Sequence, residues 1–290
     1  MRDSVVTHGV LAWGESGSFM RPILFSLPFG LPIYGYGAML CLSLILGRLL
    51  AVRLARRAGL DAALISRCCV WTLVGALIGS RLLYVVTNPS QFERVMDMFA
   101  WWKGGVVAYG GFLGGFLGSA LFCRIHRIRL LAWADAAAPA LCLGLMITRV
   151  GCLLGGCDFG RPWDGPWSIQ FPAGSPAFQE QVREGLLPVA AAGSLPVHPT
   201  QVYESLVGLG LLLMTIVVRR RQKAEGQVFL AVVIGYAVLR GALEVLRGDA
   251  DRGGIGPLST SQWIALLTLL CGASLLWAQW RRSRRLTRTT

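Results

Sequence analysis

Long blocks of apolar residues are the feature of this sequence that most restricts its fold. A helix needs about 20 mostly apolar residues to cross the hydrocarbon core of a membrane. We predict seven such spans, at residues 33–52, 64–86, 106–123, 130–154, 202–218, 228–246 and 262–280. Only 15% of the 290 residues are charged, against about 25% in soluble domains. The sequence therefore predicts an all-α, polytopic protein that forms one integral membrane domain over residues 1–290.

Basic residues lie in alternate loops between these predicted spans. Fifteen Lys and Arg residues follow the odd-numbered spans, whereas the other loops carry five. Because positively charged loops stay in the cytoplasm, we expect the N-terminus outside and the C-terminus in the cytoplasm. The proline-rich loop 155–199, between spans four and five, is then a small extracytoplasmic head with a short helix at 177–184. These topogenic clusters account for the net charge of +13, so we expect no nucleic-acid partner.

Ionisable residues inside the predicted spans need an explanation, because a charge at the bilayer centre costs about 2.5–3.5 kcal/mol. Arg48 can extend to the cytoplasmic interface, and Asp135 suits a helix-start or pairing role. Arg240 and Glu244 share a helix face and suit an ion pair. The residues expected near the outer interface are Arg81, Tyr109, Arg149, Glu204, Arg240, Glu244 and Arg247. Their positive surplus predicts an anion, and guanidinium groups match the phosphate of a lipid headgroup.

Glycines recur at intervals of four in the third predicted span. Gly110, Gly114 and Gly118 form one such row, and Gly111 and Gly115 form another. A row of small residues favours close packing between helices. The alternative is a bare face against which a lipid chain lies.

Three segments of the chain match motifs of a known family. Residues 148–161 read TRVGCLLGGCDFGR, similar to a signature that begins Gly-Arg-x-Gly-Asn-Phe and closes on Gly-Arg. Residues 198–204 read HPTQVYE, similar to His-Pro-x-Gln-Leu-Tyr-Glu, and residues 235–247 read GYAVLRGALEVLR, similar to a Tyr…Arg…Glu segment. The pairs Tyr36-Gly37 and Gly110-Gly111 also fit. The chain thus resembles the bacterial prolipoprotein diacylglyceryl transferase family over nearly its whole length.

This resemblance implies transfer of a diacylglyceryl group from phosphatidylglycerol to the lipobox cysteine thiol of a preprolipoprotein, the first step of bacterial lipoprotein maturation. Glycerol phosphate is the leaving group, and no metal or organic cofactor is implied. The partners are phosphatidylglycerol, preprolipoprotein signal peptides and membrane lipid. The enzyme would lie in the bacterial inner membrane with its site facing the outer leaflet. Arg149 and Arg240 would bind the phosphate and serve catalysis, in a pocket formed with Tyr36, Gly160, His198, Glu204, Tyr236, Glu244 and Arg247.

The sequence departs from this family at the residue expected to act as base. The family's His-Gly-Gly reads Tyr109-Gly110-Gly111 here. A tyrosine with a pKa near 10 is a poor base at neutral pH, although it can donate a hydrogen bond to a headgroup, so we place Tyr109 among the catalytic residues. The alternative is a divergent paralogue that binds or transports anionic phospholipid, or uses another acceptor, without this transferase activity.

A second departure is Cys152, where the family has asparagine. With Cys157 it forms a C-x₄-C pair at the outer end of the fourth predicted span. A disulfide in an oxidising compartment and two free thiols are both compatible with this spacing. A zinc site would need four ligands, which one nearby histidine does not complete.

Overall fold

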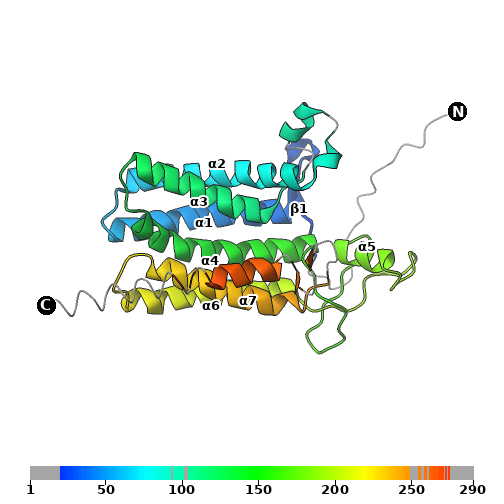
Figure 1. The fold of residues 1–290 in the computed structure, drawn as a ribbon. Helices are drawn as coiled ribbons and strands as arrows, with labels where there is room; N and C mark the ends of the chain where they lie inside the picture. The colour runs from blue at the N-terminus through cyan, green and yellow to red at the C-terminus, as the bar shows by residue number, and fades with distance from the viewer. Residues whose placement is uncertain are drawn as a thin grey trace. The chain divides into compact units, whose positions relative to one another are not determined.

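The computed structural model describes residues 20–92, 94–100, 104–248, 254–255, 258–259, 261–270, 272 and 274. Among them are six helices long and apolar enough to cross a membrane: α1 (Gly35–Arg57), α2 (Ala62–Thr87), α3 (Ala108–Ile125), α4 (Leu130–Gly155), α6 (Thr200–Arg220) and α7 (Gln227–Glu244) (Figure 1). They confirm the prediction of a polytopic, mainly helical membrane protein. Their ends agree with the first six predicted spans to within two residues, except that α1 continues to Arg57.

The seventh predicted span, 262–280, is only partly covered by the described residues. An apolar helix runs over Ser261–Leu270, which is shorter than a membrane span. Most of the residues from 271 to 280 lie outside the described part of the chain. The number of spans therefore stays a prediction.

The chain divides into two compact units, whose boundary falls within α1, α4, α6 and α7. Unit 1 comprises residues 1–42, 145–207 and 239–264. Unit 2 comprises residues 43–144, 208–238 and 265–290. The proposed organisation as one membrane domain over residues 1–290, with an insertion at 155–199, stays a prediction.

Glycines allow α2 and α3 of unit 2 to pack backbone against backbone, side by side in Figure 1. A Cβ on Gly79 would lie 2.3 Å from the carbonyl oxygen of Gly110, and one on Gly114 would lie 2.2 Å from that of Gly75. No larger residue fits at such distances. The glycine rows of the third predicted span thus serve close helix packing, as predicted, and α2 covers the face that a lipid chain would otherwise have contacted.

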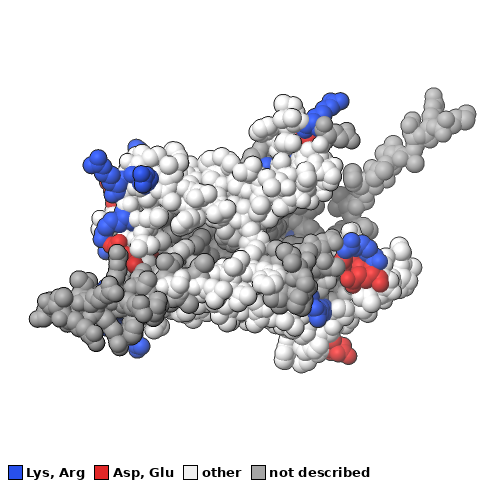
Figure 2. Space-filling model, viewed as in Figure 1, with Lys and Arg blue, Asp and Glu red and all other residues white. Residues whose placement is uncertain are grey.

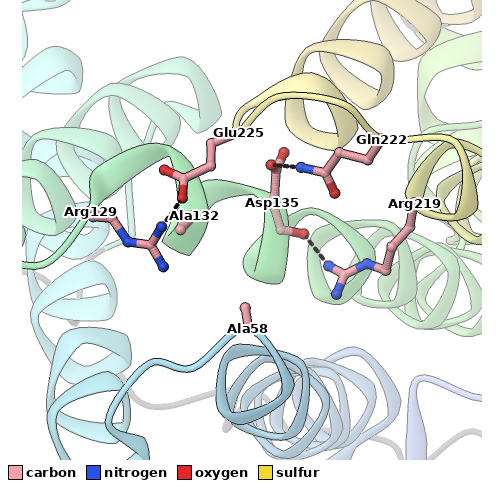
Figure 3. Close-up of a pocket in the computed structure, with 7 residues that line it drawn as sticks. All are labelled: Ala58, Arg129, Ala132, Asp135, Arg219, Gln222 and Glu225. Atoms are coloured by element: carbon pink, nitrogen blue, oxygen red, sulfur yellow. Dashed lines mark hydrogen bonds and ion pairs between the residues drawn. The ribbon is translucent and has the colours of Figure 1, made fainter.

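Asp135 on α4 supplies hydrogen bonds to the start of another helix of unit 2. Its carboxylate accepts from the backbone N–H groups of Gly226 at 2.6 Å and Phe229 at 2.9 Å, where α7 begins, and from the side-chain amide of Gln222 at 2.5 Å. Figure 3 shows Asp135 facing a cavity of about 90 Å³ between Gln222 and Arg219. The predicted helix-start role is confirmed, but the helix that it caps is α7 rather than α4.

Arg81, in α2, holds the loop that follows its own helix. This loop contains 3-10 turns at Pro89–Gln91 and Val95–Phe99. The guanidinium group is 5% exposed and donates to the carbonyl oxygens of Asp97, Met98, Ala100, Gly104 and Gly105. The positive surplus predicted for binding an anion includes Arg81, but in the structure its donors contact backbone carbonyl groups. A charge count by depth could not foresee this, because it contains no information on the direction of the side chain.

Basic residues mark one end of unit 2. Figure 2 shows basic side chains at this end, and the turns that join α1 to α2 and α3 to α4 carry arginines. Arg56, Arg57, Arg124 and Arg127 are exposed there. Apolar side chains are exposed along the helices themselves, as expected for faces that contact lipid.

Unit 1 contains most of the non-helical structure. β1 (Ile23–Ser26) and β2 (Pro32–Tyr34) form an antiparallel hairpin around a 3-10 turn at Pro28–Gly30, and β3 (Gly254–Ile255) pairs with β4 (Leu258–Ser259). The all-α prediction missed these pairs because strands of two to four residues are too short to show alternation. The predicted head helix is confirmed as α5 (Pro176–Arg183), where Ser175 Oγ accepts from Phe178 N at 3.2 Å and caps the helix.

Candidate functional site

Four charged side chains of unit 1 form a closed ring of ion pairs, which we call the arginine ring: Arg149, Asp158, Glu204 and Arg247. Arg149 Nη1 lies 2.6 Å from Asp158 Oδ2, and Arg149 Nε lies 2.5 Å from Glu204 Oε2. Arg247 pairs with the other oxygen of each carboxylate, at 2.9 Å to Glu204 Oε1 and in direct contact with Asp158 Oδ1. Each carboxylate thus bridges both guanidinium groups.

The chain brings this ring together from four separate segments. Arg149 lies in α4, Glu204 lies in the first turns of α6, and Arg247 follows the end of α7. Asp158 lies in the turn after α4 with φ +59°, a left-handed conformation that aspartate tolerates better than most residues. Its carbonyl oxygen accepts from Thr200 Oγ1 at 2.6 Å, which ties the turn to the start of α6.

The members of the arginine ring differ in exposure. The side chains of Glu204 and Arg247 are 3% and 4% exposed, whereas that of Asp158 is 29% exposed. Burial by itself would raise the pKa of Asp158, but the neighbouring charges of Arg247 and Arg149 outweigh burial and lower this pKa. Asp158 therefore stays ionised, and it is the carboxylate that a ligand can most readily replace.

Asp158 was missed by the sequence analysis. We expected more positive than negative charge at this site, yet two arginines and two carboxylates balance within the arginine ring. Asp158 stands inside the 148–161 segment that carried the family resemblance. Asp158 lies just beyond a predicted span and three residues before Arg161, and this position could have marked it as a site residue. Its partners, however, depend on tertiary folding.

A small backbone junction supports the arginine ring from the side. Gly160 N donates to His198 O at 3.1 Å, and Arg161 N donates to Leu246 O at 2.8 Å. A Cβ on Gly160 would lie 2.5 Å from both Cβ and the carbonyl oxygen of His198. Glycine is thus required for this approach, and the junction holds Asp158 and Arg247 close together in space although they are far apart in the chain.

The second predicted phosphate-binding arginine, Arg240, is also paired. Its guanidinium group contacts the carboxylate of Glu244 four residues further along α7, and Nη2 lies 3.4 Å from Ser261 Oγ. The side chains of Arg240 and Glu244 are 12% and 6% exposed. The intrahelical pair that the spacing predicted is therefore present.

His198 belongs to an aromatic cluster beside this junction. Its ring stacks on that of Trp163 with centroids 4.3 Å apart, and Nδ1 lies 3.4 Å from the hydroxyl group of Tyr203. That hydroxyl group accepts from Trp167 Nε1 at 2.7 Å. Burial lowers the pKa of His198, so the imidazole is neutral at neutral pH and can accept or donate one hydrogen bond.

The three tyrosines predicted for the site fall in different units. Tyr36 begins α1 in unit 1, where a Cβ on Gly151 of α4 would lie 3.3 Å from Tyr36 Cα. Tyr36 therefore stands close to the part of α4 that carries Arg149. Tyr109 and Tyr236 belong to unit 2, and their place at the same site as Arg149 stays a prediction.

Cys152 and Cys157 are free thiols, so the structure contains the unpaired form of this pair. Their sulfur atoms and a carboxylate oxygen of Asp158 lie within 4.8 Å of one another, a spacing that could hold a metal ion. Both oxygens of Asp158 are bound by Arg149 and Arg247, however. Two guanidinium groups at this distance also repel a divalent cation, so these three residues do not fit a metal well.

Within the described residues, fold and site together define a polytopic membrane protein with a buried arginine–carboxylate ring and a further arginine–glutamate pair, a class suited to binding an anionic group. Residues 22–278 match the prolipoprotein diacylglyceryl transferase family. The chain belongs to this family.

Several relatives carry the name phosphatidylglycerol–prolipoprotein diacylglyceryl transferase. The chain is 32% identical to that of Clostridium tetani over 253 residues, which are 87% of this chain and 95% of that protein. It is 34% identical to that of Gloeobacter violaceus over 88% of this chain and 92% of the relative. It is 33% identical to that of Thermus thermophilus over 85% of this chain and 94% of the relative.

Proposed function

We propose that this chain transfers the diacylglyceryl group of phosphatidylglycerol to the cysteine thiol of prolipoproteins. Its membership of the family over residues 22–278 is the observation that carries this function. Relatives named for this activity align with 85–88% of the chain. The chain is therefore an enzyme, a transferase that forms a thioether.

The reaction places clear demands on the site. The acceptor sulfur, as a thiolate, attacks the glyceryl carbon that carries the phosphate ester. A carbon–sulfur bond forms, the carbon–oxygen bond breaks, and its electrons leave with glycerol phosphate. The thiol must give up its proton to a base, and cations near the departing oxygen lower the barrier.

Arg149 and Arg240 are the cations that we assign to the phosphate. The lipid phosphate replaces Asp158 on Arg149, because Asp158 is the exposed carboxylate of the arginine ring while Glu204 is 3% exposed. Arginine suits this exchange, since its planar guanidinium group binds carboxylate and phosphate with the same geometry. Glu204 and Arg247 keep the guanidinium group of Arg149 in position. The other predicted pocket residues are Tyr36, Gly160, His198, Tyr236 and Glu244.

Tyr109 remains our assignment for the residue that acts on the acceptor thiol or the headgroup. The carboxylates of Glu204 and Glu244 are already paired with arginines, and the charges of Arg247 and Arg149 lower the pKa of Asp158 and make it a weak base. Tyr109 stands where the family has its histidine, and its hydroxyl group can donate to a phosphate oxygen or to the leaving oxygen.

The charge pattern of the loops supports an orientation for the whole chain. We propose seven spans, with the N-terminus outside and the C-terminus in the cytoplasm of a bacterium, because the basic loops follow the odd-numbered spans. The site then faces the outer leaflet of the inner membrane, from which phosphatidylglycerol enters. The signal peptide of the prolipoprotein is an apolar helix and enters from the lipid as well.

Complementation of a transferase-depleted bacterial strain tests this function directly. We expect expression of the chain to restore growth and diacylglyceryl-modified lipoproteins. In a matched assay, the purified protein receives labelled phosphatidylglycerol and a lipobox peptide, and the thioether product is followed by mass spectrometry. Binding of phosphatidylglycerol without any thioether, while a related transferase is active in the same assay, would instead identify a lipid-binding paralogue.

A further inference from the structure

Two thiols lie together at the point where α4 ends. Cys152 is buried in the last turn of α4, and Cys157 follows the helix at a partly exposed position. Cys157 N donates to Cys152 O at 3.1 Å, and Cys157 Sγ lies 3.7 Å from the same oxygen. The backbone therefore holds the two residues close together, with their sulfur atoms within 4.8 Å.

The surroundings of this pair favour the reactive form of a thiol. Arg149 Nη1 donates to Cys152 Sγ at 3.8 Å, so a guanidinium charge stands beside the pair of thiols. The hydrogen bond with Cys152 lowers the pKa of the Cys157 thiol, and Arg149 lowers it further. Thiolates are the attacking species in thiol–disulfide exchange.

We propose that Cys152 and Cys157 are a reversible dithiol–disulfide pair, oxidised by exchange with a partner that carries a disulfide. The Cys157 thiolate, which is the more accessible one, attacks a sulfur of the partner's disulfide, so that a mixed disulfide forms and one partner thiolate leaves. Cys152 then gives up its proton and attacks Cys157 Sγ, which releases the second partner thiolate. Two cysteines lose two protons and two electrons, and the partner's disulfide becomes two thiols.

The disulfide would close a short loop, so its effect on the structure would be local. Closing so few residues constrains the unfolded chain less than a long loop would, so the disulfide adds less to global stability than one between distant segments. It does fix the turn that leads to Asp158, the next residue after Cys157. Oxidation therefore acts on the position of the exposed carboxylate of the arginine ring.

The chain contains a matched control for accessibility. Cys68 and Cys123 also contact each other through their thiols. They are 0% and 1% exposed within an apolar core cluster of unit 2. Exchange requires that the attacking thiol reach its target, so we expect the Cys68–Cys123 pair to stay reduced under conditions that oxidise Cys152 and Cys157.

Peptide mapping of the full-length protein tests the proposal. The reduced protein in detergent is incubated with oxidised glutathione, denatured, alkylated and digested with trypsin, which yields a peptide of residues 150–183 with Cys152 and Cys157 and no third cysteine. After oxidation we expect this peptide to carry no alkyl group and to be two hydrogens lighter than the free dithiol. After reduction with dithiothreitol and renewed alkylation, it should carry an alkyl group on each cysteine. Cys68 and Cys123 should be fully alkylated throughout.

Single variants test the order of the steps. Cys152→Ser should trap glutathione as a mixed disulfide on Cys157, whereas Cys157→Ser should leave Cys152 alkylated. Full alkylation of both cysteines in the wild-type protein after oxidation would overturn the proposal. So would protection of both thiols by added Zn²⁺ without loss of hydrogen, because this result would make the pair part of a metal site.

Discussion

Asp158 decides how much positive charge the arginine ring can offer to a substrate. It neutralises Arg149 and Arg247 together, and its side chain is the most exposed of the ring, at 29% against 18% for Arg149. An anionic headgroup that binds Arg149 therefore competes with a carboxylate that is already in place. The affinity of the site for lipid is the difference between two similar interactions.

Replacement of Asp158 by asparagine should strengthen the binding of phosphatidylglycerol. Asparagine keeps the shape and tolerates the left-handed backbone, but it removes the competing charge. A partly exposed ion pair contributes about 0.2–1 kcal/mol, so KM for phosphatidylglycerol should fall by up to about fivefold. Initial rates measured against lipid concentration in mixed micelles give KM for phosphatidylglycerol. Asp164→Asn, the same change at an exposed head residue, should leave KM unchanged, and a higher KM for Asp158→Asn would show that Asp158 organises the site instead.

Tyr109 offers a second test at the level of one side chain. If its hydroxyl group acts on the thiol or the headgroup, Tyr109→Phe should lower kcat by about tenfold or more, since positioned proton donors and bases contribute about 10²–10⁴-fold. Tyr109→His, which restores the residue typical of the family, should retain or raise kcat. The thioether-forming assay with a lipobox peptide measures all three proteins. Equal rates would remove Tyr109 from the mechanism.

The pair of α2 and α3 shows what glycine contributes to an element. Both helices expose bare backbone at the same level, and carbonyl oxygens of one helix lie where side chains of the other would stand. In lipid, water is not expelled when helices meet, so close packing and weak polar contacts must supply the association energy. The glycine rows therefore hold α2 against α3.

Gly114→Ala should separate these two helices. Its Cβ would overlap the carbonyl oxygen of Gly75 at 2.2 Å, whereas a Cβ on Gly111 of the same helix has its nearest neighbour at 3.6 Å. We expect Gly114→Ala to cost about 1–3 kcal/mol, as overpacking does, and Gly111→Ala to be neutral or slightly stabilising. Thermal unfolding in detergent compares the two variants. A similar loss of thermal stability in both variants would mean that alanine destabilises the helix itself and not its contact with α2.

For the molecule as a whole, orientation in the membrane is the property to establish. A fluorescent protein fused after Thr290 should fold and fluoresce, because we place the C-terminus in the cytoplasm. Alkaline phosphatase fused after Val189, which is 79% exposed in the head, should be active, because this enzyme matures only outside the cytoplasm. The opposite pattern of activities would reverse the proposed topology.

The sequence predicted the helices of this protein well and their contacts less well. Membrane spans can be recognised in a sequence because lipid requires about 20 apolar residues in one run. The ends of the first six predicted spans agree with the helices to within two residues, apart from the end of α1. Spacing along one helix was equally informative, as for the pair Arg240 and Glu244. Both signals are local in the chain.

Contacts between distant segments were not predictable in this way. Asp158 meets Arg247 across 89 positions, and nothing in the spacing of either residue announces the other. Arg81 has the charge and the predicted membrane depth of a ligand-binding arginine. Its side chain nevertheless donates to carbonyl groups of the loop that follows α2. Depth in the membrane can be estimated from sequence, whereas the direction of a side chain depends on the packed fold.

The cap that Asp135 provides also bears on how the protein is made. Asp135 lies 91 positions before Gly226, whose N–H group it accepts at the start of α7. The ribosome therefore delivers the cap long before the helix that needs it, and α4 waits in the bilayer with a carboxylate ready at its end. When α6 and the following turn emerge, Gln222 and Gly226 bind this carboxylate, and α7 begins at a place chosen by an earlier helix. Because synthesis runs from the N-terminus, the cap for α7 is made before α7 itself, and α7 can be capped as soon as it forms.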